Sequence, residues 1–354
     1  MKIGHNFDHI IADSSLGIIL VGTLNRAEYQ GFWICSQSPY SFLYHFNESF
    51  EHIYVSKDHI VVKDPAFIYW LLSFQHSFTP KESIQLLNKT KLFEGSVHDY
   101  CLFESPFISF LNFTNIYTPV LIDVLSGKDL LKENNIEIPD GFSSRSLTRE
   151  YFTIERPKDD RSYEIWIFQL SNLTKPPLKI LTPEYPSVFF DGNMYFVAFK
   201  LDEKETRIDC YFHNSGKKTS AFIPFSHHVD SINMNVVCSR KIKEFKIDWL
   251  LKNKSIEIYL WNSDYTSLTL WKSIDNLHVH ILDCFHSCLS LVALWSFQEN
   301  SFTKISIYSK SRKQVSEISL PEGFSRLIGD QKSRIYSRCV VNNEFYLCVF
   351  DFAN

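Results

Sequence analysis

One short segment holds most of the side chains in this sequence that could bind a metal ion. Residues 278–288 (HVHILDCFHSC) supply imidazoles and thiols, which are the ligands that zinc takes. In an unbroken strand, alternation would place these candidates on one face: His278, His280, Cys284, His286 and Cys288. A straight strand spreads such ligands apart, whereas zinc needs a tetrahedral cluster. We therefore expect this segment to form a strand, a tight turn near 285–287 and another strand. We expect no metal or other cofactor. A zinc site at these residues is the alternative.

Two further groups could supply acid–base chemistry. His227 and His228 precede Asp230, but the segment IPFSHHVDS is polar and flanked by proline, which predicts a solvated loop. Asp159 and Asp160 lie beside Arg161, as in a charged hairpin tip. The sequence contains no glycine-rich phosphate loop and no Gly-x-Ser-x-Gly nucleophile elbow. We expect no catalytic residues and a protein that is not an enzyme.

Basic residues gather at a few places in a chain whose net charge is only −4. The main clusters are Lys217 with Lys218, and Lys310 with Arg312 and Lys313. The near balance of 36 basic and 40 acidic residues excludes a generally basic nucleic-acid binder. These clusters are therefore either solubilising turn charges or a basic rim that meets an acidic protein. Nucleic acid could bind only through such a local rim.

Aromatic residues are in surplus, because 31 Phe, 17 Tyr and 7 Trp stand beside 11 Gly and 3 Met. Most of them are expected to pack in a core. Some are candidates for an exposed partner surface, namely Phe142 beside a loop-like stretch, Tyr40 with Phe42, and Phe74 with Phe78.

The elements that must carry these residues are short aromatic and β-branched runs, such as GIILVGT (17–23) and MYFVAFKL (194–201). The best helical candidate is 80–93, which also fits an outer strand. No apolar run is long enough for a membrane helix, and no apolar segment marks a secretory signal at the start. The scattered cysteines fit reduced thiols. We therefore expect a cytoplasmic or nuclear protein that is not secreted and does not insert into membranes.

The strands recur in units of roughly 40–50 residues. The units are predicted to start near His9, Phe50, Val97, Arg149, Pro186, Asn235 and Val279. The tetrapeptides at 125–128 (LSGK) and 214–217 (NSGK) recur where a third strand would turn to a fourth. This periodicity predicts an all-β fold, a β-propeller of four-stranded antiparallel blades, with seven blades favoured and eight as the alternative.

The whole chain, 1–354, is expected to form a single propeller domain. The N-terminal segment would add a strand to the sheet made by 334–341 and 344–352, closing the ring, and 132–150 would be an irregular insertion. The alternative is two β-domains joined near 136–148.

On periodicity and turn placement, the chain resembles a highly diverged WD40-like propeller. Gly-His and Trp-Asp signatures do not recur, but Asp123 and Asp209 lie near the place of the aspartate in such repeats. The segments 188–200 (VFFDGNMYFVAFK) and 255–274 (SIEIYLWNSDYTSLTLWKSI) resemble the repeats of F-box-associated domains, β-structures that bind substrates for ubiquitin ligases. No F-box helices precede these segments.

A closed β architecture without a set of residues that could do chemistry predicts a non-catalytic protein–protein interaction scaffold, a subunit of a eukaryotic multiprotein complex that is monomeric by itself. One alternative is the substrate receptor of a ubiquitin ligase. A second is a propeller-type hydrolase whose carboxylates converge on the central channel.

Overall fold

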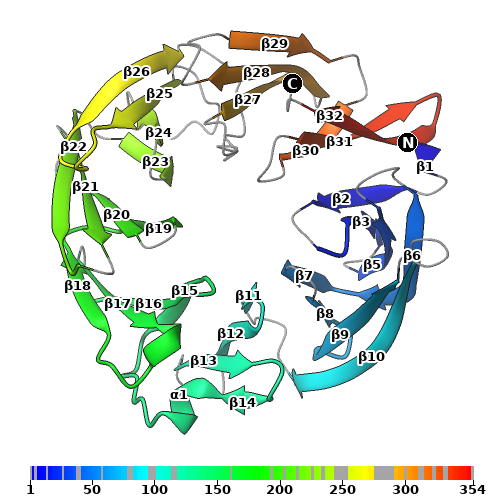
Figure 1. Ribbon diagram of the computed structural model, residues 1–354, viewed down its shortest axis with the longest axis horizontal. Coiled ribbons are helices and arrows are strands. Elements are labelled where there is room, and N and C mark those ends of the chain that lie inside the picture. Colours follow the sequence, from blue (N-terminus) through cyan, green and yellow to red (C-terminus); the bar gives the residue numbers. More distant parts are fainter. Residues whose placement is uncertain are drawn as a thin grey trace. The chain divides into compact units, whose positions relative to one another are not determined.

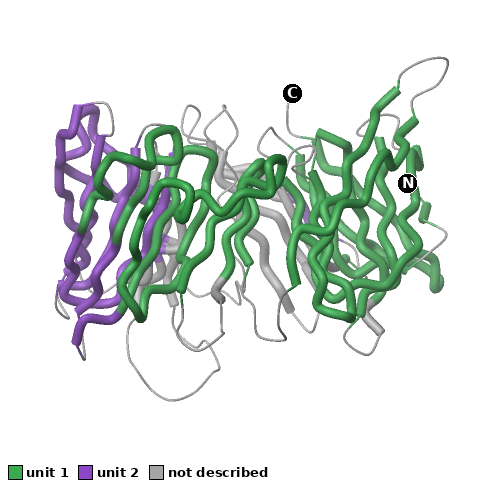
Figure 2. The backbone as a smooth tube through the Cα atoms, turned by 90° about the horizontal axis from the view of Figure 1, so that it is seen from below, with its two compact units in different colours: residues 1–156, 166–179, 323–354 green, residues 157–165, 180–322 purple. Residues whose placement is uncertain are grey.

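The computed structural model is built almost entirely of β-strands (Figure 1). The structure describes residues 2–3, 6–12, 15–25, 28–36, 41–56, 59–77, 83–94, 101–112, 118–159, 162–191, 194–201, 205–212, 215–224, 227–232, 236–242, 254–274, 291–298, 301–309, 315–320, 324–329 and 334–351. Two compact units divide the chain, one made of 1–156, 166–179 and 323–354 and the other of 157–165 and 180–322 (Figure 2).

Within the described residues the strands form eight sheets, and neighbouring strands in each sheet are hydrogen-bonded. The first sheet contains β2 (Phe7–Ile11), β3 (Ile18–Gly22), β5 (Glu28–Cys35) and β4 (Leu24–Asn25), and β6 (Phe42–Phe50) also pairs with β5. The second contains β10 (Ser83–Glu94), β9 (Ile68–Ser77), β8 (His59–Lys63) and β7 (His52–Ser56). The third contains β11 (Cys101–Glu104), β12 (Phe107–Asn112), β13 (Thr118–Asp123) and β14 (Lys128–Asp129), and the fourth contains β15 (Ser143–Leu147), β16 (Tyr151–Pro157), β17 (Tyr163–Gln169) and β18 (Leu178–Thr182).

The remaining sheets follow the same plan. The fifth contains β19 (Ser187–Asp191), β20 (Met194–Lys200), β21 (Glu205–Phe212) and β22 (Lys218–Pro224), and the sixth contains β23 (His227–Ile232), β24 (Val236–Ile242), β25 (Lys254–Trp261) and β26 (Leu268–Ile274). The seventh contains β27 (Leu291–Gln298), β28 (Ser301–Ser309) and β29 (Val315–Ser319). The eighth contains β1 (Lys2–Ile3), β32 (Glu344–Asp351), β31 (Arg334–Val341) and β30 (Phe324–Gly329). The helical segments in the part of the chain that the structure describes are α1 (Leu130–Glu133) and a 3-10 turn at Leu170–Asn172.

The predicted all-β fold of mostly four-stranded antiparallel sheets is confirmed. The described residues form eight sheets, which is the number of the alternative; the first of them has five strands and the seventh has three. The eighth sheet is built from three C-terminal strands, β30, β31 and β32. It gains its fourth strand because β1 pairs antiparallel with β32, placing Lys2 opposite Tyr346 and Ile3 opposite Phe345. The single closed domain stays a prediction.

The structure decides one open alternative and shows that one local prediction is wrong. Residues 83–94 form the outer strand β10 and not a helix, because their backbone groups pair along β9 with two register shifts. His227 and His228 lie in β23, opposite Lys241 and Arg240, and not in a loop. Pairing with β24 decides this segment, and a local polar composition does not reveal such pairing.

The stretch 132–150 is less irregular than predicted, because it includes the end of α1 and the strand β15. Asp129 caps α1 by accepting hydrogen bonds from the Leu131 and Lys132 amides at 3.1 and 3.4 Å. The chain then returns to the core, where Phe142 packs among buried residues of the third and fourth sheets. Phe142 is fully buried, so its prediction as an exposed interaction residue is wrong.

The Ser-Gly pairs of the repeated tetrapeptides lie in similar turns after a third strand. The Gly127 amide donates to the Asp123 carbonyl at 2.8 Å, and the Gly216 amide donates to the Phe212 carbonyl at 2.9 Å. Both glycines have positive φ, 69° and 64°, which glycine adopts without strain. The recurrence of LSGK and NSGK therefore marks equivalent turns, leading to β14 and β22.

Aromatic rings pack between neighbouring sheets, as predicted for most of the aromatic surplus. In the unit containing the N-terminus, the Phe93 ring lies 4.4 Å from the Tyr69 ring and 4.0 Å from the Phe110 ring of the next sheet. Cysteines also pack in the core, as the buried Cys35 shows. Burial raises the pKa of Cys35 to about 12, so its thiol stays neutral and behaves as a small hydrophobic group. No helix in the described part of the chain has the length and apolar character needed to span a membrane.

Candidate functional site

Several predicted site residues lie outside the described residues. These are the zinc candidates His278, His280, Cys284, His286 and Cys288, and the basic residues Lys310, Arg312 and Lys313. The zinc alternative and the basic rim therefore stay predictions. Across the described ranges, no group of three or more His, Cys, Asp and Glu side chains could hold a metal ion.

Lys217 and Lys218 lie where β21 turns into β22 and project to opposite faces of the fifth sheet. The Lys217 ammonium lies 5.7 Å from the centre of the Phe212 ring. Its positive charge also helps to lower the pKa of Asp264, although a hydrogen bond from Thr266 contributes more. The Lys218 ammonium lies 2.8 Å from Asp209 and 5.0 Å from the centre of the Tyr211 ring. The two lysines therefore belong to different surfaces.

A buried carboxylate organises the face that carries Lys218. Asp209 on β21 has a side chain only 4% exposed. One of its oxygens accepts hydrogen bonds from Arg207 Nε and Ser220 Oγ, both at 2.7 Å, and the other pairs with Lys218. Arg207 Nη2 also donates to Ser220 Oγ at 3.2 Å. We call Arg207, Asp209, Lys218 and Ser220 the Asp209 cluster.

The register of the fifth sheet explains why these residues meet. Asp209 faces Ser220, Arg207 faces Phe222, and Tyr211 faces Lys218 on the neighbouring strand. Directly opposed residues on adjacent strands share one face, and every second residue of a strand returns to that face. The alternation Lys218, Ser220, Phe222 along β22 therefore builds one continuous surface over β21.

Aromatic rings support the charged groups of this face from within the sheet. The Tyr211 ring stacks on the Tyr195 ring at 4.8 Å, and the Phe190 ring lies 6.3 Å from Tyr195. These residues are successive register partners across β19, β20 and β21. Lys218 ends the row at the last strand of the sheet. The ammonium therefore sits over a fixed aromatic platform.

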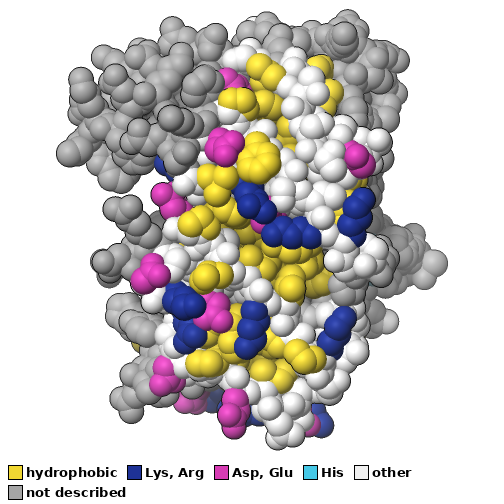
Figure 3. All heavy atoms as spheres, turned by 90° about the vertical axis from the view of Figure 1, so that its left-hand side faces the viewer, with side chains coloured by type: hydrophobic (Ala, Val, Ile, Leu, Met, Phe, Trp, Pro, Cys, Tyr) yellow, Lys and Arg dark blue, Asp and Glu magenta, His cyan; other side chains and the backbone are white. Residues whose placement is uncertain are grey.

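Arg207 has a similar arrangement one row further along. Its guanidinium carbon lies 5.9 Å from the Phe199 ring centre and 6.0 Å from that of Phe222. The Phe222 side chain is nevertheless 45% exposed. Figure 3 faces the side of Figure 1 on which β21 and β22 lie, and it shows basic side chains among hydrophobic ones. The surface thus combines cations with exposed apolar area.

The pKa values of Lys218 and of the neighbouring Tyr211 phenol are both shifted. Burial lowers the pKa of Lys218, but its hydrogen bonds to Asp209 and Tyr211 and the attraction of these groups outweigh burial, so the pKa is raised overall. Burial raises the pKa of Tyr211, and Lys218 opposes this shift. At neutral pH the site therefore presents a charged ammonium over a neutral phenol.

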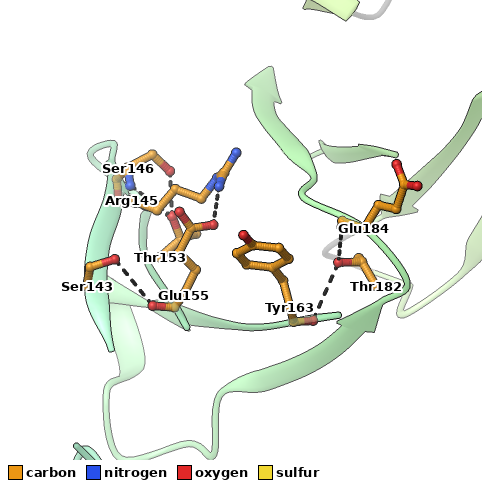
Figure 4. A network of polar contacts seen from close by, with 8 residues as sticks. All are labelled: Ser143, Arg145, Ser146, Thr153, Glu155, Tyr163, Thr182 and Glu184. Carbon is orange, nitrogen blue, oxygen red and sulfur yellow. Dashed lines mark hydrogen bonds and ion pairs between the residues drawn. The ribbon is translucent and has the colours of Figure 1, made fainter. Parts of the chain in front are cut away.

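Another polar network lies in the fourth sheet and was not indicated by the sequence (Figure 4). Arg145 on β15 pairs with Glu155 on β16, and both side chains are largely buried. The Ser146 and Thr153 hydroxyls hydrogen-bond at 2.6 Å on the same two strands. Separately, the Thr182 hydroxyl donates to the Glu184 carbonyl at 2.8 Å. An arginine-neutralised carboxylate of this kind fits a structural ion pair better than a general acid or base.

A serine–histidine contact occurs between the second and third sheets. Ser105 Oγ lies 2.8 Å from His59 Nδ1, a spacing that also suits a nucleophile and its base. However, Ser105 is buried, and its amide donates to Ser56 Oγ at 2.9 Å. This contact joins the β7–β8 and β11–β12 turns, and we interpret it as a structural contact and not as a catalytic pair.

The sequence pointed to Lys217, Lys218 and Asp209, but it did not indicate Arg207, Ser220 or Phe222 as their partners. The available signal is the alternation in 218–224 (KTSAFIP), whose buried members are Thr219, Ala221 and Ile223. Reading that period would have placed Ser220 and Phe222 on the face of Lys218.

Replacing Asp209 with asparagine is expected to lower the free energy of unfolding by about 2 kcal/mol, because two cations lose their buried counter-charge. Urea unfolding followed by tryptophan fluorescence measures this loss. The matched variant is Asp123→Asn, since Asp123 accepts hydrogen bonds from the Leu125 amide and the Ser126 hydroxyl, both within its own turn. Its loss should be under about 0.5 kcal/mol. Equal losses would contradict the importance assigned to the Asp209 charge.

No protein-family description and no curated protein matches this sequence. Solved structures do match it at low identity. Sqt1 from Chaetomium thermophilum, bound to the N-terminus of the ribosomal protein L10, is 9% identical with a TM-score of 0.54, and the match covers 98% of each chain. The WD40 domain of SCAP from fission yeast is 8% identical with a TM-score of 0.52, and the match covers 100% of this chain and 97% of that one.

A third match is the dipeptidyl peptidase 4 of Porphyromonas gingivalis, at 9% identity and a TM-score of 0.57. It covers 99% of this chain but only 58% of the peptidase. At such identities the matches define the fold alone. Together with the repeated four-stranded sheets and the LSGK and NSGK turns, they show that this chain has the fold of a highly diverged WD40-like β-propeller.

Proposed function

We propose that this protein is a non-catalytic scaffold for protein–protein interaction and a subunit of a multiprotein complex. The observation that carries the proposal is the placement of exposed large hydrophobic side chains. Many of those in the described part of the chain lie on the last strand of a sheet: Phe42 on β6, Leu87 on β10, Leu178 and Leu181 on β18, Phe222 on β22, and Leu270 on β26.

Exposed apolar side chains on edge strands make an isolated protein prone to associate with other chains. Edge strands usually carry charges or proline, which discourage association with other chains. Exposed apolar residues on several edge strands therefore suit surfaces that are covered in a complex. The likeness to Sqt1 supports this reading, because that propeller was solved with the N-terminus of a ribosomal protein bound.

Isolation of the tagged chain from the cells that make it tests the proposal. We expect a stoichiometric partner that stays bound through size-exclusion chromatography with light scattering. The triple variant Leu178→Ser, Leu181→Ser and Phe222→Ser should release a partner that uses these strands. Circular dichroism should show that this variant remains folded. Recovery of a 41.5 kDa monomer alone, under conditions that preserve other complexes, would contradict the proposal.

A further inference from the structure

We infer that the β22 edge binds an extended, acidic segment of a partner protein, which adds as a strand beside Lys218–Pro224. This inference rests on the proposed function and names the site and the chemistry of the partner. The segment would carry a carboxylate opposite Lys218 and an aromatic or aliphatic side chain opposite Phe222.

The position of β22 makes strand addition feasible. It is the last strand in its sheet, and in the described part of the chain it pairs along β21 only. The outward edge of such a strand presents alternate backbone N–H and C=O groups, which an extended peptide can pair with. The other face of the strand is fixed by the core, where Ala221 and Ile223 pack with residues of the sixth sheet.

The charges of this edge select an acidic occupant. The Asp209 cluster contains two cations and one carboxylate, so it is net positive in a chain whose total charge is −4. Asp209 is only 4% exposed, whereas Arg207 and Lys218 are 31% and 42% exposed. Between Lys218 and Phe222 a partner therefore meets the two cations and not Asp209, and the Glu205 carboxylate lies at the far end of the face, opposite Pro224.

Both cations retain hydrogen-bonding capacity. Arg207 uses Nε for Asp209 and Nη2 for Ser220, and a guanidinium has five N–H donors. Lys218 has three donors and bonds to Asp209 and Tyr211. A carboxylate from a partner could accept from either group, while Asp209 and the Tyr211 ring hold them in place.

Phe222 determines where the partner strand needs its apolar side chain. It lies four residues from Lys218 on the same face, a separation of roughly 13 Å along a strand. A partner strand therefore needs its carboxylate and its apolar side chain four residues apart. This spacing distinguishes strand addition from general attraction between an acidic protein and a basic surface.

A fluorescein-labelled peptide, Thr-Glu-Thr-Val-Thr-Phe-Thr, tests the inference by anisotropy with the full chain. A peptide with lysine in place of glutamate is its charge-reversed counterpart. We expect binding of the acidic peptide that weakens at least tenfold with Lys218→Glu and at least fivefold with Phe222→Ala. The Lys218→Glu chain should bind the lysine peptide better than the acidic one.

Two variants serve as matched controls. Lys128→Glu changes a lysine that also follows a Ser-Gly turn and pairs with a carboxylate, that of Glu133. Phe42→Ala removes a ring that is 47% exposed, close to the 45% of Phe222, from the edge strand β6. Both should leave peptide binding unchanged, and thermal unfolding checks that every variant is folded.

Equal binding of the two peptides, no binding of the acidic peptide, or equal weakening by Phe42→Ala and Phe222→Ala would overturn the inference. The native complex separates this failure from that of the proposed function. A native partner that stays bound to the Lys218→Glu and Phe222→Ala variants leaves the scaffold function intact and excludes this site. Absence of any native partner contradicts the scaffold function itself.

Discussion

Replacing Gly31 with alanine is expected to lower the free energy of unfolding by about 4 kcal/mol or more, because the new methyl group would collide with backbone. Gly31 lies in β5, where the register with β6 shifts between Gln30 and Phe32. Its φ is 74°, and a Cβ atom here would lie 2.3 Å from the Phe46 carbonyl oxygen. Phe46 belongs to β6 and lies opposite Phe32, so its carbonyl cannot move away without breaking the β5–β6 pairing. Denaturant unfolding measures the loss.

Gly127 and Gly216 provide the matched control. Their φ values, 69° and 64°, are close to that of Gly31, but a Cβ atom at either position would meet nothing within 4 Å. Alanine there should cost about 1 kcal/mol, which is the strain of the left-handed backbone alone. Losses at Gly31 no larger than at these turns would show that β6 does not approach β5 as closely as described.

The strands and the repeat were predictable because they depend on local composition. Runs such as 194–201 (MYFVAFKL) combine aromatic and aliphatic residues that fit a pleated surface, and the structure has β20 there. The tetrapeptides LSGK and NSGK were informative because, in both, a glycine with positive φ lies in the turn that follows the third strand. Turn chemistry of this kind is set within four residues, so a sequence shows it directly.

Features set by distant parts of the chain were not predictable in the same way. Phe142 follows a loop-like segment, and its burial depends on α1 and on Trp166 of β17. His227 and His228 become a strand through pairing with β24. The sequence indicated only part of the candidate site, namely Lys218 and Asp209. Their contact, however, depends on the register of β21 against β22, which one sequence does not specify.

Replacing Glu51 with leucine is expected to lower the free energy of unfolding by about 3 kcal/mol, since it removes a counter-charge from a buried ammonium. The Lys63 side chain is 1% exposed and lies 3.3 Å from Glu51, which is 23% exposed. Its ammonium also lies 4.9 Å from the centre of the Phe67 ring. Aromatic rings offset only part of the lost ion pairing, so most of the loss remains in the single variant.

The double variant Glu51→Leu with Lys63→Met tests this explanation. Methionine removes the charge and keeps a long apolar side chain, so the double variant should regain most of the stability lost by Glu51→Leu. Lys128 and Glu133 form an exposed pair at 3.2 Å, and Glu133→Leu should cost under about 0.5 kcal/mol. A double variant no more stable than Glu51→Leu would mean that the glutamate acts through packing. The buried charge of Lys63 would then not be what makes Glu51 necessary.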